Sequence, residues 1–227
     1  MRTLPADSPQ LFSPTGGAGP TFDHEQIWAD QGLIVCGCDE AGRGPLAGSV
    51  TAAAVVLDVT NIPDGLDDSK KLSEKRREAL FHEIMVHHAV AAICLNAATI
   101  DAMNIRAASL KAMEMAVAAL PLMVEHSLID GNAVPDGLKG RATALVKGDS
   151  RSLSIAAASI VAKVLRDRQM VHADSLFPQY GFAGHKGYPS AAHRELVAQI
   201  GPCPLHRKTF APVRKALEAR RGNKKPD

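Results

Sequence analysis

Residues 35–45 of this chain read Val35-Cys36-Gly37-Cys38-Asp39-Glu40-Ala41-Gly42-Arg43-Gly44-Pro45. The apolar residues just before Gly37 predict a short buried strand, which delivers two adjacent carboxylates into a glycine-rich loop. Buried carboxylates that lack a partner either become protonated or acquire a counter-ion. A divalent metal ion beside Arg43 and bare backbone would suit chemistry on a phosphate. The alternative interpretation is a solvated Asp39-Glu40 pair followed by a plain turn.

Two further acids follow predicted strands and adjoin glycines. Asp130 precedes Gly131 after the apolar run 127–129, and Asp149 follows Gly148 after the run 142–146. In open α/β sheets, ligands bind in the crevice beyond the strand ends, so these acids could converge there with Asp39 and Glu40. Carboxylate oxygens suit hard cations such as Mg²⁺ or Mn²⁺. The alternative is that both acids are turn formers, because Asp-Gly is a strong turn signal.

Asp39 and Glu40 present a geometric difficulty. Consecutive residues of a regular strand point to opposite faces of the sheet, so both cannot face one site from such a strand. We therefore expect the chain to leave the strand at this pair, with Gly42 and Gly44 easing the bend. Asp39 would bind a metal ion directly, and the longer Glu40 would reach round to it.

The remaining pattern predicts an α/β protein in which a hairpin of strands opens a mixed sheet covered by helices. The expected strands are 33–36, 50–57, 90–97, 127–129 and 142–146, and the expected helices are 73–88, 104–120, 154–172, 190–200 and 213–221. We place the domain boundaries at 1–30 for a flexible N-terminal extension rich in Pro and Gly, 31–215 for the catalytic domain, and 216–227 for a basic C-terminal tail.

Composition excludes several classes of protein. The chain has 227 residues, of which 46% are hydrophobic and 22% charged, as in ordinary globular proteins. No apolar run is long enough to span a bilayer and no signal peptide is recognisable, so we expect a cytoplasmic protein without a membrane partner, acting as a monomer. The four cysteines lack the spacing of a zinc site and are expected to be buried thiols. Residues 206–227 carry a net charge of +6, which suits either a phosphate-binding arm or a solvated tail.

The string Asp39-Glu40-Ala41-Gly42-Arg43-Gly44-Pro45, continued by Leu46-Ala47-Gly48, resembles the signature of the type 2 ribonucleases H. The segments 68–73, 128–132, 147–150, 159–163 and 185–190 are similar to further segments of that family, and the resemblance covers about residues 33–213. It implies the ribonuclease H-like fold, a central mixed five-stranded sheet flanked by helices, with additional helices towards the C-terminus. Only the N-terminal extension departs from the family pattern.

The resemblance also implies an activity and a set of site residues. The implied activity is hydrolysis of RNA in RNA–DNA hybrids and cleavage 5′ of single ribonucleotides in duplex DNA, with roles in DNA replication and ribonucleotide excision repair. Two Mg²⁺ or Mn²⁺ ions would assist, and the products would carry 3′-hydroxyl and 5′-phosphate ends. The implied catalytic, metal-binding residues are Asp39, Glu40, Asp130 and Asp149. The implied substrate-binding residues are Gly42, Arg43, Gly44, Lys70, Ser159, Lys163 and Tyr188.

Within this set, the glycine loop would read the ribose 2′-hydroxyl and Tyr188 would pack on the following deoxyribose. Lys70 and Lys163 would contact phosphates. Arg166 and Asp167 are expected to form a structural ion pair, and the histidines of residues 185–206 receive no role. Two other hypotheses stay open at this stage, a two-metal DNA nuclease and a non-catalytic hybrid binder; the first would not need the ribose-reading loop, and the second could dispense with the acids.

Overall fold

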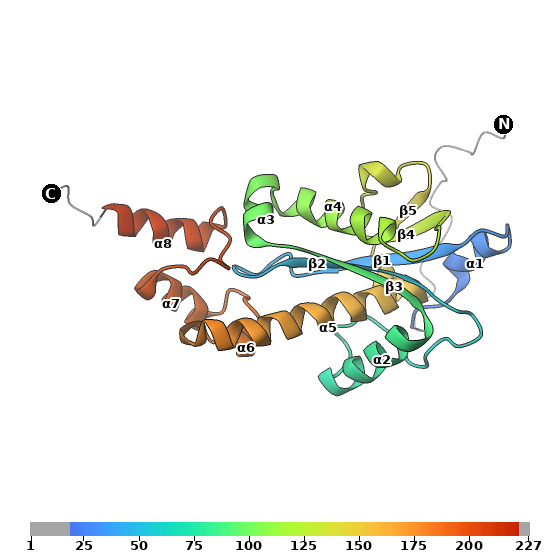
Figure 1. Cartoon of the computed structure of the whole chain (residues 1–227), viewed down its shortest axis with the longest axis horizontal. Coiled ribbons are helices and arrows are strands. Elements are labelled where there is room, and N and C mark those ends of the chain that lie inside the picture. Colours follow the sequence, from blue (N-terminus) through green and yellow to red (C-terminus); the bar gives the residue numbers. More distant parts are fainter. Residues whose placement is uncertain (1–18, 223–227) are drawn as a thin grey trace.

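The structure, a computed structural model, describes residues 19–222. Five strands form one sheet, and the helices cover both of its faces (Figure 1). The strands are β1 (Val35–Ala41), β2 (Val50–Val56), β3 (Ala89–Leu95), β4 (His126–Asp130) and β5 (Ala142–Leu145). The α-helices are α1 (Asp23–Ala29), α2 (Glu74–His87), α3 (Ala97–Met103), α4 (Ile105–Ala118), α5 (Leu153–Leu176), α6 (Phe182–His185), α7 (Ala191–Ile200) and α8 (Ala211–Gly222), with 3-10 turns η1 (Asp136–Leu138), η2 (Gly148–Ser150) and η3 (Pro178–Tyr180).

The sheet is mixed, as predicted. Its strand order is β3-β2-β1-β4-β5, with β1 antiparallel to β2, β2 antiparallel to β3, and β1, β4 and β5 mutually parallel. The hairpin of β1 and β2 and the central position of β1 place the end of β1 beside the end of β4. This arrangement confirms the expected α/β class and the ribonuclease H-like sheet.

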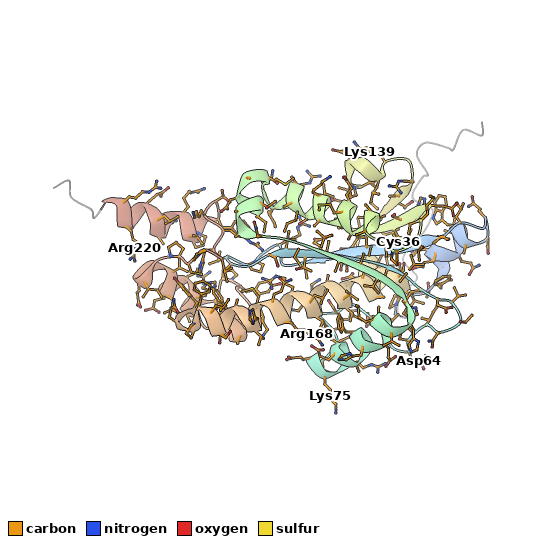
Figure 2. All side chains as sticks on the ribbon, in the orientation of Figure 1. Cys36, Asp64, Lys75, Lys139, Arg168 and Arg220 are labelled. Atoms are coloured by element: carbon orange, nitrogen blue, oxygen red, sulfur yellow. The ribbon has the colours of Figure 1, made fainter. Side chains whose placement is uncertain are left out.

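Two helical layers enclose the sheet. Helices α3 and α4 lie over one face, and α5 with α2 lies over the other (Figure 1). Buried side chains fill both spaces, while charged side chains such as Lys75 and Lys139 point away from the ribbon (Figure 2). Cys36 and Cys38 are fully buried under α4, as expected of core thiols. The expectation of buried thiols is wrong for Cys94, which is exposed near the end of β3, and Cys203 is only partly buried.

Helix α5 lies against β1 at a close approach that only glycine permits. An added Cβ at Gly37 would overlap the backbone of Ser154 and Ile155 in the first turn of α5. Glycine in a strand interior often marks such a contact between two backbones. Gly37 therefore sets the distance between the central strand and the longest helix.

The helix termini follow the sequence signals. Ser73 accepts a hydrogen bond from the Arg76 N–H at the start of α2, and Asn104 accepts one from the Ala107 N–H at the start of α4. The α5 N-terminus is closed by Glu25 of α1, a buried carboxylate that accepts from the Ser154 N–H at 2.8 Å. Because α1 packs here, residues 19–30 differ from the expected flexible extension; residues 1–18 lie outside the described part of the chain.

The C-terminal region also differs from the expected basic tail. Residues 216–222 belong to α8, whose Val213 and Ala216 are buried in a cluster with Phe182 of α6 and Val197 of α7. Residues 223–227 are outside the described range. Within residues 19–222, no helix is both long and apolar enough to cross a bilayer.

Candidate active site

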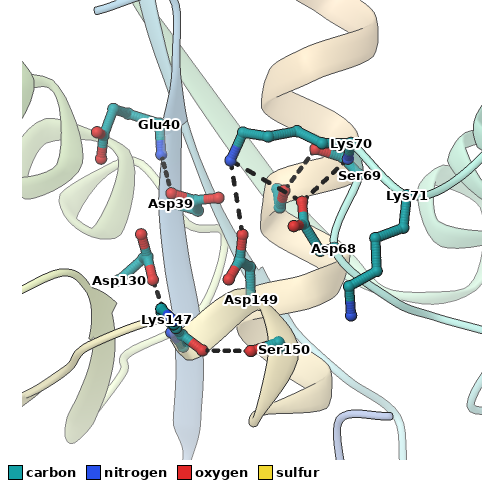
Figure 3. Close-up of polar contacts among 12 residues, drawn as sticks. Asp39, Glu40, Asp68, Ser69, Lys70, Lys71, Asp130, Lys147, Asp149 and Ser150 are labelled. Atoms are coloured by element: carbon teal, nitrogen blue, oxygen red, sulfur yellow. Dashed lines mark hydrogen bonds and ion pairs between the residues drawn. The ribbon is translucent and has the colours of Figure 1, made fainter.

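Asp39 and Asp130 lie side by side on two adjacent parallel strands. The register pairs Cys38 with Ile129, so the following residues, Asp39 and Asp130, are also neighbours. Both project from the face of the sheet that α5 covers, and Figure 3 shows them directed towards a common region. Asp130 accepts a hydrogen bond from the Gly148 N–H at 2.7 Å, which orients its carboxylate.

Glu40 corrects one sequence-based prediction. The strand does not end at Asp39-Glu40: β1 stays paired with β2 through Ala41, which lies opposite Thr51. Because the strand is regular here, Glu40 points to the opposite side from Asp39 (Figure 3). The Glu40 carboxylate lies 3.3 Å from the Arg43 guanidinium, and Glu40 and Asp130 line the same small pocket near α4. Glu40 therefore approaches the other acids from the α4 side of the sheet.

Asp149 completes the acidic group from the other side. It lies in η2, just beyond β5, where the left-handed conformation of Lys147 (φ 56°) turns the chain back towards β4. Lys70, from the loop before α2, brings its Nζ within 3.7 Å of Asp149 and 3.9 Å of Asp68 (Figure 3). Four carboxylates from three chain segments thus surround the ends of β1 and β4.

Burial and repulsion from neighbouring carboxylates raise the pKa values of Asp39, Glu40 and Asp149. Burial raises the pKa of Asp39 well above its ordinary value, and the charges of Glu40 and Asp130 raise it further. Burial raises the pKa of Glu40 to about 7, although Arg43 opposes the shift. Burial and then Asp130 raise the pKa of Asp149. The group would therefore be stabilised by added positive charge.

The donor set fits hard divalent cations, but the cage is not preformed. No group of three or more His, Cys, Asp or Glu side chains within residues 19–222 is placed to hold one ion. Glu40 pairs with Arg43 and Asp149 pairs with Lys70, so each of these two carboxylates already has a cationic partner. The fit rests on chemistry: buried Asp39 has no Lys or Arg ion-pair partner among the described residues, and its neighbours offer only oxygen ligands.

Two fully buried arginines hold the loop that follows these acids. Arg207 donates to the carbonyls of Gly42, Arg43, Gly48 and Ser49, at 2.6–3.1 Å. Arg166 donates to the carbonyls of Ala47, Ser49 and Lys186. Neither guanidinium pairs with a carboxylate in the described chain, so the predicted Arg166–Asp167 ion pair is wrong; Asp167 pairs instead with Lys163 at 2.8 Å. Sequence patterns do not reveal such clamps, because their partners are backbone atoms far away in the chain.

Gly42 and Tyr188 occupy the two sides of this clamped loop. Gly42 has φ +96°, and a Cβ there would overlap the Arg166 side chain, so this position requires glycine. Tyr188 is 42% exposed, with the Arg166 guanidinium 5.5 Å and the Lys163 ammonium 6.0 Å from the ring centroid. A Cβ on Gly44 would lie 3.8 Å from the Tyr188 ring, so loop and ring are adjacent.

The remaining predicted binding residues differ in their exposure to solvent. Lys70 is exposed next to the acids and Arg43 is exposed beside Glu40. Ser159 is buried and donates to the Ser69 hydroxyl at 2.7 Å. Ser159 therefore contacts the loop that carries Lys70 rather than an open surface, a difference from the direct substrate contact that we expected.

Replacing Arg207 by lysine is expected to destabilise the protein by about 3 kcal/mol, because one ammonium cannot satisfy four buried carbonyls along the loop. Urea unfolding monitored by circular dichroism measures the change. Arg214→Lys is the matched control, since Arg214 is exposed and makes a long hydrogen bond to the Thr209 carbonyl and a surface ion pair with Glu218. Equal unfolding free energies for the two variants would contradict the clamp.

The sheet order, the helices on both faces and the acids at the ends of β1 and β4 define a nuclease of the ribonuclease H-like fold. The fold is similar to that of ribonuclease H2 from Pyrococcus horikoshii OT3, with a TM-score of 0.72 and 28% sequence identity, over 84% of this chain and 100% of that chain.

Sequence comparison identifies the family. The family model of ribonuclease HII matches residues 36–213. The chain is 56% identical to a ribonuclease HII from Sinorhizobium fredii over 81% of its own length and 80% of the relative, and 51% identical to one from Brucella ovis over 94% and 98%. This chain belongs to the ribonuclease HII family. It is an endoribonuclease, a hydrolase with ribonuclease H activity on RNA–DNA hybrids.

Proposed function

We propose that this enzyme also cuts duplex DNA on the 5′ side of single embedded ribonucleotides, leaving 3′-hydroxyl and 5′-phosphate ends. One observation carries the proposal: the clamped loop at Gly42 begins three residues after Asp39 and meets Tyr188 at Gly44. A sugar held between this loop and the tyrosine would have its phosphate next to the acids.

Asp39, Glu40, Asp130 and Asp149 are the proposed metal ligands, with Mg²⁺ or Mn²⁺ as the ions. Two such ions, when bound, would supply an activated water and charge stabilisation for the leaving oxygen. The chain itself supplies orientation: the Gly148 N–H holds Asp130, and β1 holds Asp39 beside it. In this structure Arg43 pairs with Glu40 and Lys70 pairs with Asp149. When substrate binds, both cations would leave these carboxylates and pair with phosphates of the substrate.

Recognition of the sugar is assigned to Gly42, Arg43, Gly44 and Tyr188. The 2′-hydroxyl distinguishes RNA from DNA, and backbone groups of a glycine loop can approach it without a Cβ in between. The Tyr188 ring would pack on the next sugar, where a deoxyribose fits better because it lacks the hydroxyl. Lys163 would contact a phosphate near this ring, and Ser159 would act through Ser69 on the loop that carries Lys70.

The test uses a duplex DNA with one ribonucleotide, incubated with the protein and Mg²⁺ or Mn²⁺, beside an all-DNA duplex of the same sequence. We expect one cut, 5′ of the ribonucleotide, and none in the control; the end groups follow from ligation and phosphatase treatment. Equal cutting of both duplexes would support a DNA nuclease, and binding without cutting would support a hybrid binder. Either outcome would contradict the proposal.

A further inference from the structure

Three histidines, two of them buried, lie behind Tyr188, and the established activity leaves them without a role. His193 and His206 are essentially inaccessible to solvent, and His185 stacks on His193 with ring centroids 4.2 Å apart. They come from α6, α7 and the segment between α7 and α8. Packed aromatic rings alone are no evidence of a function. The hydrogen bonds of these rings show which groups they hold in place.

The hydrogen bonds form a chain whose ends have fixed polarity. The Cys203 backbone N–H can only donate, and it lies 3.0 Å from His206 Nδ1. His206 Nδ1 is therefore an acceptor, and the ring proton is on Nε2. His206 Nε2 lies 3.0 Å from His193 Nε2, which must accept, so the proton of His193 is on Nδ1. That Nδ1 lies 2.9 Å from the Tyr188 carbonyl, which can only accept.

Both rings are therefore neutral in one tautomer each. A second proton on either ring would set two N–H groups against each other, at Cys203 or between the two rings. Burial lowers the pKa of His193, and burial together with His193 lowers the pKa of His206 to about 4. Neutral rings at physiological pH agree with the direction that the geometry requires.

The chain ends on the backbone of the residue that we assign to sugar recognition. The Gly187 carbonyl accepts from the Leu46 N–H at 2.8 Å, and the Arg207 N–H donates to the Leu46 carbonyl at 2.8 Å. Hydrogen bonds thus join three segments: residues 203–207, Leu46 after the glycine loop, and residues 187–188. A shift of the His193 ring would move the Tyr188 backbone, and with it the ring that adjoins Gly44.

We propose that His193 and His206 are positioning residues, which hold Tyr188 against the glycine loop and so set the preference for a deoxyribose after the ribonucleotide. This inference rests on the proposed function, because it assigns the residues behind its specificity. A specific readout is the junction ratio, which we define as kcat/KM for a duplex with a ribonucleotide followed by a deoxyribonucleotide, divided by kcat/KM for the same site followed by a ribonucleotide.

Two nearly isosteric substitutions separate the hydrogen bond from the packing. His193→Asn keeps an N–H donor near the position of Nδ1, whereas His193→Leu removes it. We expect the leucine variant to lower the junction ratio about tenfold and the asparagine variant to keep it within about twofold, because only the leucine variant removes the side-chain donor from the Tyr188 carbonyl, which then keeps the Ser190 N–H alone. The exposed His172→Gln variant is the control and should keep the wild-type ratio. In a Tyr188→Ala background, His193→Leu should leave the ratio unchanged.

An unchanged ratio in His193→Leu, or equal losses in the leucine and asparagine variants, would overturn the proposal. A second measurement uses the wild-type protein, so it tests the proposal even if these variants fold poorly. Nitrogen-15 NMR of the wild-type histidine rings at neutral pH should show the proton on Nε2 in His206 and on Nδ1 in His193. The opposite tautomers would overturn the chain of hydrogen bonds regardless of substrate, whereas failure to cut at a single ribonucleotide would overturn the proposed function instead.

Discussion

Asp130→Asn is expected to reduce turnover by about three orders of magnitude while the fold persists, because the change removes a charge worth several kcal/mol of transition-state stabilisation. The fold persists because an asparagine Oδ1 can still accept the hydrogen bond from the Gly148 N–H. Single-turnover cleavage of a short RNA–DNA hybrid, measured beside thermal unfolding, separates the two effects.

The control for this substitution is Asp136→Asn. Asp136 is an exposed aspartate in η1 that pairs only with Lys139 on the surface, so its neutralisation should leave cleavage at the wild-type rate. Wild-type turnover in Asp130→Asn would remove Asp130 from the proposed metal ligands. A loss of activity matched by a loss of folded protein would point to a structural role instead.

Gly37→Ala is expected to destabilise the protein by more than about 3 kcal/mol, since the added methyl group would overlap backbone atoms that cannot turn aside. Either α5 must move away from β1 or the strand must bend. Both changes would also displace Asp39, two residues further along the strand, so activity should fall with stability.

Gly184→Ala provides the comparison for this prediction. Its Cβ would meet no heavy atom within 4 Å, so the midpoint of urea unfolding should stay near that of the wild type. If Gly37→Ala unfolded at the same urea concentration as Gly184→Ala, the close packing of α5 on β1 would be wrong.

Local signals predicted most of the secondary structure. The helix after Ser73 begins at its capping residue, and the helix after Asn104 ends before Pro121, as both patterns indicate. These elements were predictable because caps, prolines and apolar periodicity act over a few neighbouring residues. The acidic positions were also visible in the sequence, since each follows an apolar run and adjoins a glycine or another acid.

The error at Glu40 has a specific cause. The glycines of the loop suggested an early bend, but pairing with β2 keeps β1 extended as far as Ala41. Strand pairing is a non-local interaction, and it overrides a weak local preference. Non-local contacts also explain why the predicted Arg166–Asp167 ion pair does not form. Arg166 donates instead to the carbonyls at positions 47, 49 and 186.

The sequence by itself determined the fold class, the family and the candidate acids, because these depend on residue types at fixed spacings along the chain. Only the tertiary structure decided that Glu40 faces away from Asp39, that two arginines clamp the glycine loop, and that His206 and His193 lead to Tyr188. Those contacts join residues that lie 13 or more positions apart in the sequence, or they rely on backbone groups that every residue possesses. No local pattern distinguishes such groups until the chain has folded.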